Sequence, residues 1–260
     1  MKIASHAAGS SIKGEIFTPC HAVLFGIGQE DVENVQDFNL PDLRNKSPKI
    51  NITLQNSATG KSEVIVPFAD GLTLSEIATF GEGVVFMTEY KLYYMLLLNP
   101  DANLNLSNDK FLSYELILGD NAQRPVDVFA ITLGQNSDFV ARYDKLSVPA
   151  GTSRQSFDMS EVDMLALPDF NQGKFDSIRI EYKSGVVAEM TSEELMYIMS
   201  RANDVTAVKS SSVTGISDFP VCYSFFRCCV LNLVDVKSLT IVRDIIGLAN
   251  NYEFVTVNLK

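Results

Sequence analysis

The chain has 260 residues, of which 46% are hydrophobic, which is enough apolar material for one large or two medium domains. A formal net charge of −11 argues against a protein that clamps nucleic-acid phosphates over its whole surface. The length excludes a disulfide-stapled miniprotein, and the uneven spacing of the four cysteines fits a reducing compartment.

The first fourteen residues contain Lys2 and Lys13 among small side chains and no acidic residue. They lack the apolar block of a secretory signal, so we do not predict a cleaved leader. We expect a disordered N-terminal arm, and in a second interpretation its two lysines lie against an anionic membrane surface. No apolar stretch reaches the ~20 residues that span a bilayer, so we expect a soluble or peripheral protein.

Most of the chain reads as short strands, because apolar runs of a few residues alternate with turn signals. β-branched and aromatic residues dominate these runs, as is typical of pleated, half-buried surfaces. The predicted class is therefore mainly β. The predicted strands are residues 22–26, 49–54, 63–68, 84–90, 92–98, 112–118, 126–133, 139–143, 177–182, 186–190, 222–226, 228–234, 239–242 and 253–259.

Two short helices are predicted, and both open with a Thr followed three residues later by a Glu. One begins at Thr73 with Glu76, and the other begins at Thr191 with Glu194. In this pattern the Thr hydroxyl accepts from the backbone N–H three residues on, and the Glu favours the positive end of the helix.

The surroundings of the two helices also correspond, which indicates an internal repeat. Leu40-Pro41-Asp42 precedes a strand, a turn, a second strand and the first helix; Leu167-Pro168-Asp169 precedes the same series in the second half. We therefore expect two similar β domains after the arm at 1–14, the first over residues 15–124 and the second over residues 125–260.

Catalytic residue types are scarce. The chain has two histidines, His6 in the expected arm and His21 next to Cys20 at the start of a strand. Neighbouring residues of a strand point to opposite faces, so Cys20 and His21 do not form a nucleophile and its base. We predict no enzyme activity. The other cysteines lack metal-ligand spacing and are expected to be buried small hydrophobes, like Cys20: Cys222, Cys228 and Cys229.

One weak ion site is a candidate. Asp101, Asn103 and Asn105 place oxygen atoms at alternate positions, as a calcium loop begins. Leu106 and Leu112 occupy the places of the Gly and Glu that a helical calcium loop requires, so we expect a polar loop or a different oxygen-rich ion site. No glycine-rich phosphate loop is present, and we predict no cofactor.

The order of segments resembles the double jelly-roll major capsid proteins of icosahedral viruses with an internal membrane, of the corticovirus type and of lipid-containing flavobacterial phages. The resemblance is carried by residues 177–182 with 191–198 and by residues 228–233 with 252–257: a strand, a glycine turn, a short helix and long final strands. It implies two tandem eight-stranded jelly rolls, each with a short inserted helix.

The resemblance also implies a structural role. The chain would form a homotrimer whose six jelly rolls make a pseudo-hexagonal tile in an icosahedral shell over a membrane, as part of a virion assembled in the host cytoplasm. Its partners would be neighbouring capsomers and, through Lys2 and Lys13, the internal membrane or minor membrane proteins, with no sequence-specific nucleic acid. Two alternatives stay open: a ring-shaped DNA sliding clamp, and a two-sandwich phage receptor-binding or tail component.

Overall fold

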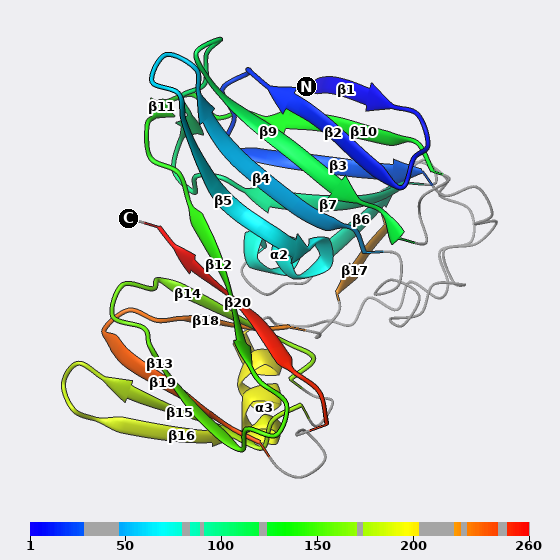
Figure 1. Ribbon diagram of the computed structural model, residues 1–260. Helices are drawn as coiled ribbons and strands as arrows, with labels where there is room; N and C mark the ends of the chain where they lie inside the picture. The colour runs from blue at the N-terminus through cyan, green and yellow to red at the C-terminus, as the bar shows by residue number, and fades with distance from the viewer. Residues whose placement is uncertain are drawn as a thin grey trace.

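The computed structural model describes residues 1–28, 47–79, 84–88, 91–119, 124–170, 174–202, 221–224, 228–243 and 249–259. Within these ranges the chain is almost entirely antiparallel sheet, with two helices. This agrees with the mainly β class that the β-branched and aromatic residues of the sequence predict. Figure 1 shows two β-sandwiches, one built from the first half of the chain and one from the second, with a helix between them.

The first sandwich has two sheets. One sheet has the strand order β1-β10-β3-β7-β6-β17, and the other has the order β2-β9-β4-β5. The strands of the first sheet are β1 (Lys2–His6), β10 (Val126–Ile131), β3 (Ala22–Gly28), β7 (Lys91–Leu97), β6 (Val84–Thr88) and β17 (Val221–Ser224). Those of the second are β2 (Ser11–Ile16), β9 (Lys110–Ile117), β4 (Lys49–Asn56) and β5 (Lys61–Asp70).

The second sandwich also has two sheets, in the orders β12-β20-β14-β18 and β13-β19-β15-β16. β8 (Asn103–Leu104) pairs in parallel with β11 (Asn136–Ser137), which lies between β10 and β12 in the chain. The strands are β12 (Arg142–Val148), β20 (Tyr252–Asn258), β14 (Met164–Pro168), β18 (Cys228–Asn232), β13 (Arg154–Asp158), β19 (Val236–Val242), β15 (Ser177–Tyr182) and β16 (Val187–Thr191).

The two sandwiches share one topology. If the eight main strands of each are numbered along the chain, with β6, β8, β11 and β17 set aside, both give sheets 1-8-3-6 and 2-7-4-5. This is the strand order of a jelly roll. In both rolls a helix is inserted between the fifth and sixth strands. The expected fold, two tandem eight-stranded jelly rolls with one short helix each, is confirmed.

The limits of the rolls differ from those expected. Residues 2–6 form β1, which pairs with β10 from His6 opposite Val126 to Lys2 opposite Phe129, so they do not form an arm. Because a jelly roll closes by pairing its first and last strands, β10 belongs to the first roll, although the expected boundary of 124/125 places it in the second. The division falls between β10 and β12.

The two helices have different N-terminal caps. In α3 (Ser192–Ala202), Thr191 Oγ1 accepts from the backbone N–H of Glu194 at 3.2 Å, and Glu194 Oε2 accepts from the N–H of Thr191 at 2.9 Å, so the predicted capping box is confirmed. In α2 (Gly71–Ala78) the cap is Asp70, whose Oδ2 accepts from the backbone N–H of Thr73 at 3.0 Å. The prediction that Thr73 caps this helix is wrong by three positions.

The hydrophobic core of the first roll extends onto one face of the second roll. The sheet containing β14 and β20 turns alternate side chains inward, among them Leu165 and Phe254, and these form the core of the second roll. The side chains between them, including Ala166 and Val257, pack into the core of the first roll. This sheet therefore has two buried faces, and burial of apolar surface joins the rolls.

Helix α2 fills the space between the rolls, and all eight of its residues are buried. Its Ser75 Oγ accepts from the backbone N–H of Met95 on β7 at 2.9 Å and donates to the Gly71 carbonyl at 2.9 Å. The Tyr143 hydroxyl on β12 donates to the Leu97 carbonyl on β7 at 2.6 Å, in a buried hydrogen bond between the rolls. These hydrogen bonds pair the polar groups that they join, which are shielded from water at the junction.

Candidate functional site

The residues considered for catalysis lie in structural positions. Cys20 is fully buried, and desolvation raises the pKa of its thiol to about 12, so the thiol stays protonated near neutral pH. His21 Nδ1 is 2.8 Å from the Asn99 carbonyl oxygen, and His6 Nε2 lies 2.5 Å from the Tyr114 hydroxyl inside the first roll. These contacts hold strands and loops together.

The remaining cysteines fit the same description where the structure shows them. Cys228 and Cys229 on β18 are both buried, and they point to opposite faces, one into each core. Burial raises the pKa of the Cys229 thiol to about 12. The side chain of Cys222 lies outside the described residues. No cluster of three or more His, Cys, Asp or Glu side chains suited to a metal ion occurs in the described ranges.

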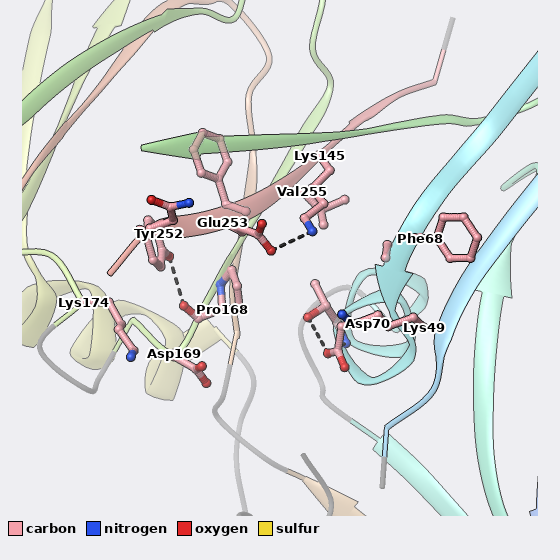
Figure 2. A pocket seen from close by; sticks show the side chains of 14 residues that line it. Lys49, Phe68, Asp70, Lys145, Pro168, Asp169, Lys174, Tyr252, Glu253 and Val255 are labelled. Carbon is pink, nitrogen blue, oxygen red and sulfur yellow. Dashed lines mark hydrogen bonds and ion pairs between the residues drawn. The ribbon is translucent and has the colours of Figure 1, made fainter. Parts of the chain in front are cut away.

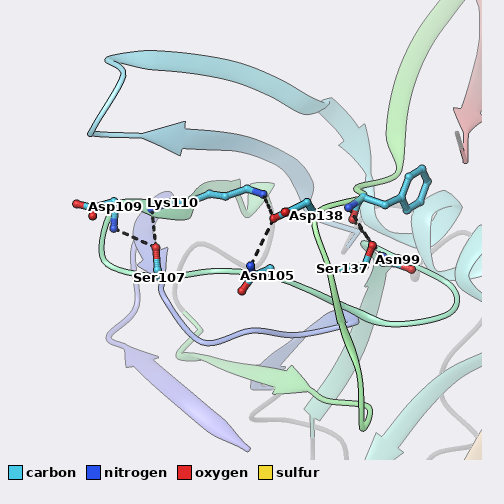
Figure 3. Close-up of polar contacts among 8 residues, drawn as sticks. Asn99, Asn105, Ser107, Asp109, Lys110, Ser137 and Asp138 are labelled. Carbon is cyan, nitrogen blue, oxygen red and sulfur yellow. Dashed lines mark hydrogen bonds and ion pairs between the residues drawn. The ribbon is translucent and has the colours of Figure 1, made fainter.

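Two of the three candidate ion ligands, Asn103 and Asn105, bind other protein groups with their side chains. Asn103 is buried, and its amide donates to the Leu133 carbonyl at 2.7 Å and accepts from the Leu133 N–H at 2.6 Å. The amide of Asn105 reaches Asp138 Oδ1 at 3.5 Å, and Asp138 also pairs with Lys110 at 2.7 Å (Figure 3). The backbone N–H of Asp101 donates to Asn99. The alternating polar residues thus fasten β8 to the segment between the rolls.

The two N-terminal lysines belong to sheet strands. Lys2 Nζ on β1 pairs with Asp127 Oδ1 at 2.7 Å, and Lys91 Nζ on β7 pairs with Asp127 Oδ2 at 2.7 Å. Lys13 on β2 lies 3.2 Å from Glu115 and is largely exposed. Neither lysine lies on an unpaired arm. Neither described helix is long and apolar enough to cross a bilayer.

A groove of about 270 Å³ lies between the rolls, beside α2 and β20. Its lining includes three lysines and three carboxylates, and Figure 2 shows that several of these groups bind one another or their own elements. Lys145 pairs with Glu253 at 2.7 Å, Asp70 caps α2, and the Tyr252 hydroxyl donates to the Pro168 carbonyl at 3.0 Å. The groove is therefore part of the interface between the two rolls.

Apolar side chains gather on the outer face of the sheet that contains β3, β7 and β10. Tyr93 lies over Gly26, where an added Cβ would stand 2.7 Å from the ring, and its ring centroid is 6.1 Å from that of Phe129. Leu24, Tyr93, Met95 and Phe129 are half-buried and lie outside both hydrophobic cores. We call these four residues, with the charged group of Lys2, Lys91 and Asp127 beside them, the outer sheet face.

A second apolar surface lies on the second roll. Tyr197 and Ile198 on α3 are 62% and 41% exposed, and with Met190 of β16 they line a shallow hollow of about 410 Å³. Glu193 and Glu194 stand at its edge. We call these five residues the helix face. The sequence predicts the cap of this helix but not its exposed apolar face. The spacing carried a signal for that face: Tyr197 follows the buried Leu195 by two positions, which is about 200° around the helix axis and so on the opposite side of the helix.

No protein-family model matches the sequence, and no curated protein sequence matches it. The strand order makes the chain a double jelly-roll protein. Its fold is similar to that of the major capsid protein P2 from bacteriophage PM2, with a TM-score of 0.53 and 7% sequence identity over 97% of this chain and 91% of that one. At this identity the similarity establishes a common fold.

Two more distant structures also align over most of their length. The PBCV-1 virus capsid model aligns with a TM-score of 0.44 and 9% identity over 99% of this chain and 92% of that one. PNGase F, a glycosylasparaginase from Flavobacterium meningosepticum, aligns with a TM-score of 0.36 and 10% identity over 99% and 93%. Both TM-scores are too low to support an inference about function.

Proposed function

We propose that the chain is a major coat protein that forms homotrimers, and that these trimers tile an icosahedral shell over an internal membrane. The observation that carries the proposal is the fold: two jelly rolls of identical strand order, fused through a sheet with two buried faces, with a capsid-protein fold as a similar structure over nearly the whole chain. Jelly rolls are a common architecture of viral coats.

The role is structural and not catalytic. The thiols of Cys20 and Cys229 are buried with raised pKa values, and the described histidines are used in contacts within the first roll. Function would then depend on self-association, and the site of action would be the virion, after assembly in the host cytoplasm. The lysines of the first two strands stay a predicted contact with lipid, to be tested by sedimentation with anionic vesicles.

The first test is the mass of the purified chain in solution, by size-exclusion chromatography with light scattering. Three copies of the 28.7 kDa chain give about 86 kDa, the mass that we expect. A particle mass that stays near 28.7 kDa as the protein concentration rises would contradict the trimer.

The second test is the abundance of the chain in purified virus particles. A coat protein is the dominant band in a stained gel and covers the particle in immunoelectron microscopy. A receptor-binding or tail component, which the same fold would also suit, is present in few copies at restricted places, and that result would refute the coat assignment. A sliding clamp is not proposed, because α2 is buried between the rolls and has no face to line a channel.

A further inference from the structure

The contact between the two rolls of one chain is a sheet face against a helix. The sheet face comes from β14, β18 and β20 of the second roll, with Met164, Ala166 and Val255 buried in it. The helix is α2, inserted in the first roll, which contacts both β14 and β18. The outer face of one roll's sheet therefore covers the inserted helix of the other roll.

Both parts of this contact are present a second time in the chain. Since the rolls share one topology, β3, β7 and β10 of the first roll correspond to β14, β18 and β20 of the second. The outer sheet face, built on Leu24, Tyr93 and Met95, is thus the counterpart of the sheet face that covers α2. The helix face on α3 is the counterpart of the covered helix.

The burial of the two helices differs as expected if one contact is made within the chain and the other is left open. All eight residues of α2 are buried, including Glu76 at 1% exposure. On α3, Leu195 is buried in its own roll, whereas Tyr197 and Ile198 are 62% and 41% exposed. Adjacent exposed apolar side chains are a common feature of protein interaction surfaces.

The charges of the two open surfaces are complementary. The helix face has Glu193 and Glu194 at its edge. The outer sheet face has two lysines, Lys2 and Lys91, whose ammonium groups both pair with Asp127. Opposite charges at the rim of an apolar contact steer association and fix its orientation.

We infer that copies of this chain join head to tail, with the outer sheet face of one copy covering the helix face of the next. The inference rests on the proposed function and names the surfaces through which the trimer forms. Every contact between consecutive rolls around the ring is then of one type, made once within each chain and once between chains. A contact of this type joins two different surfaces, so it closes into a ring when the rotation that relates one copy to the next is a whole fraction of a full turn.

Single-face variants provide the first test. We expect Ile198→Asp on the helix face and Met95→Glu on the outer sheet face each to weaken trimer formation at least tenfold, as measured by light scattering over a concentration series.

A charge-reversal variant tests the rim of the contact. Glu193→Lys should weaken trimer formation several-fold and should reduce the salt dependence of trimer formation. Val234→Asp is the matched control, because Val234 is 64% exposed in the second roll and outside both faces. Circular dichroism confirms that each variant is folded.

Mixing the two defective variants provides the decisive test. Each alone lacks one half of the contact, but together they retain one intact pair of faces, so the mixture should form dimers of one copy of each and no larger ring. Trimers that persist in both single variants would overturn the assigned surfaces while leaving the coat function intact. A mixture that stays monomeric would also overturn them, whereas a monomeric wild type would refute the trimer itself.

Discussion

Asp127 organises the charges on the outer sheet face. Burial by itself raises the pKa of this carboxyl, but hydrogen bonds from Lys2, Lys91 and Ser5 outweigh that effect and hold the pKa below its usual range. Asp127 is 9% exposed, and its carboxylate links β1, β10 and β7 across one face of the first sheet. The network therefore helps to hold the first strand of the chain in the sheet.

A carboxyl with a depressed pKa stabilises the fold above the pKa of the unfolded chain, about 4, and loses this contribution as the pH falls further. We predict that Asp127→Asn lowers the free energy of unfolding by about 1–3 kcal/mol at pH 7. Between pH 6 and pH 3 the difference between wild type and variant should shrink. Urea unfolding at several pH values measures this, with the exposed Asp144→Asn as control. A difference that is constant with pH would disprove the role.

At the scale of elements, the two inserted helices show how one architecture is specified by different local sequences. The cap of α3 is a reciprocal Thr191–Glu194 pair, whereas the cap of α2 is the single carboxylate of Asp70. Asp70 also accepts from the Thr73 hydroxyl at 2.9 Å. Both caps lie at the junction of the fifth strand with the helix, so they fix the same turn of the jelly roll.

We predict that Asp70→Ala and Thr191→Ala each cost about 0.5–2 kcal/mol of stability, because each leaves a helix N-terminal N–H without its acceptor. Asp70→Asn and Thr191→Ser keep an acceptor oxygen and are the matched controls, with smaller expected losses. Urea unfolding curves give the comparison. Equal losses for the alanine variants and their controls would show that the caps contribute nothing.

The elements that the sequence predicts well are those with long β-branched runs. Residues 177–182 and 253–259 were predicted as strands and correspond to β15 and β20. Strands β1, β13 and β14 were missed, because β1 is rich in small residues, β13 is mostly polar, and β14 ends at Pro168. Long-range pairing with partners 60 or more residues away makes these segments strands, and local patterns do not record such pairing.

The internal repeat was inferred correctly from partly incorrect correspondences. Thr73 and Thr191 match in sequence, but the position equivalent to Thr191 is Asp70. Leu40-Pro41-Asp42 lies outside the described residues. The candidate surfaces were not predicted, because both depend on which face of a sheet or helix another roll covers. That information arises only when the rolls are packed together.

At the scale of the whole molecule, the core of the first roll, to which both rolls contribute side chains, makes the two rolls one structural unit. Val255 and Val257 on the second roll pack into the core of the first, and the Tyr143 hydroxyl adds a buried hydrogen bond across the junction. The connection between the rolls is not a flexible linker but a paired segment, with Asn136 opposite Asn103. A tile built from such chains would keep a fixed angle between neighbouring rolls.

We predict a single cooperative thermal transition for the chain, with calorimetric and van't Hoff enthalpies that agree once any dissociation of subunits is taken into account. Val255→Ala removes buried methyl groups at the junction and should cost about 1–3 kcal/mol without splitting the transition. Val64→Ala, at a side chain that is 55% exposed, is the control. Two resolved transitions in the wild type would show that the rolls unfold independently.

The pairing of β1 with β10 has a consequence for synthesis on the ribosome. Strand β1 has its neighbour in the sheet at residues 126–131, so β1 waits until those residues, about 120 positions further along the chain, have been translated before it can dock. Until then the nascent chain exposes an open edge of β3, a site for mispairing with other chains. Slow, non-local closure of this kind leaves the growing polypeptide open to aggregation until β10 and β1 have docked.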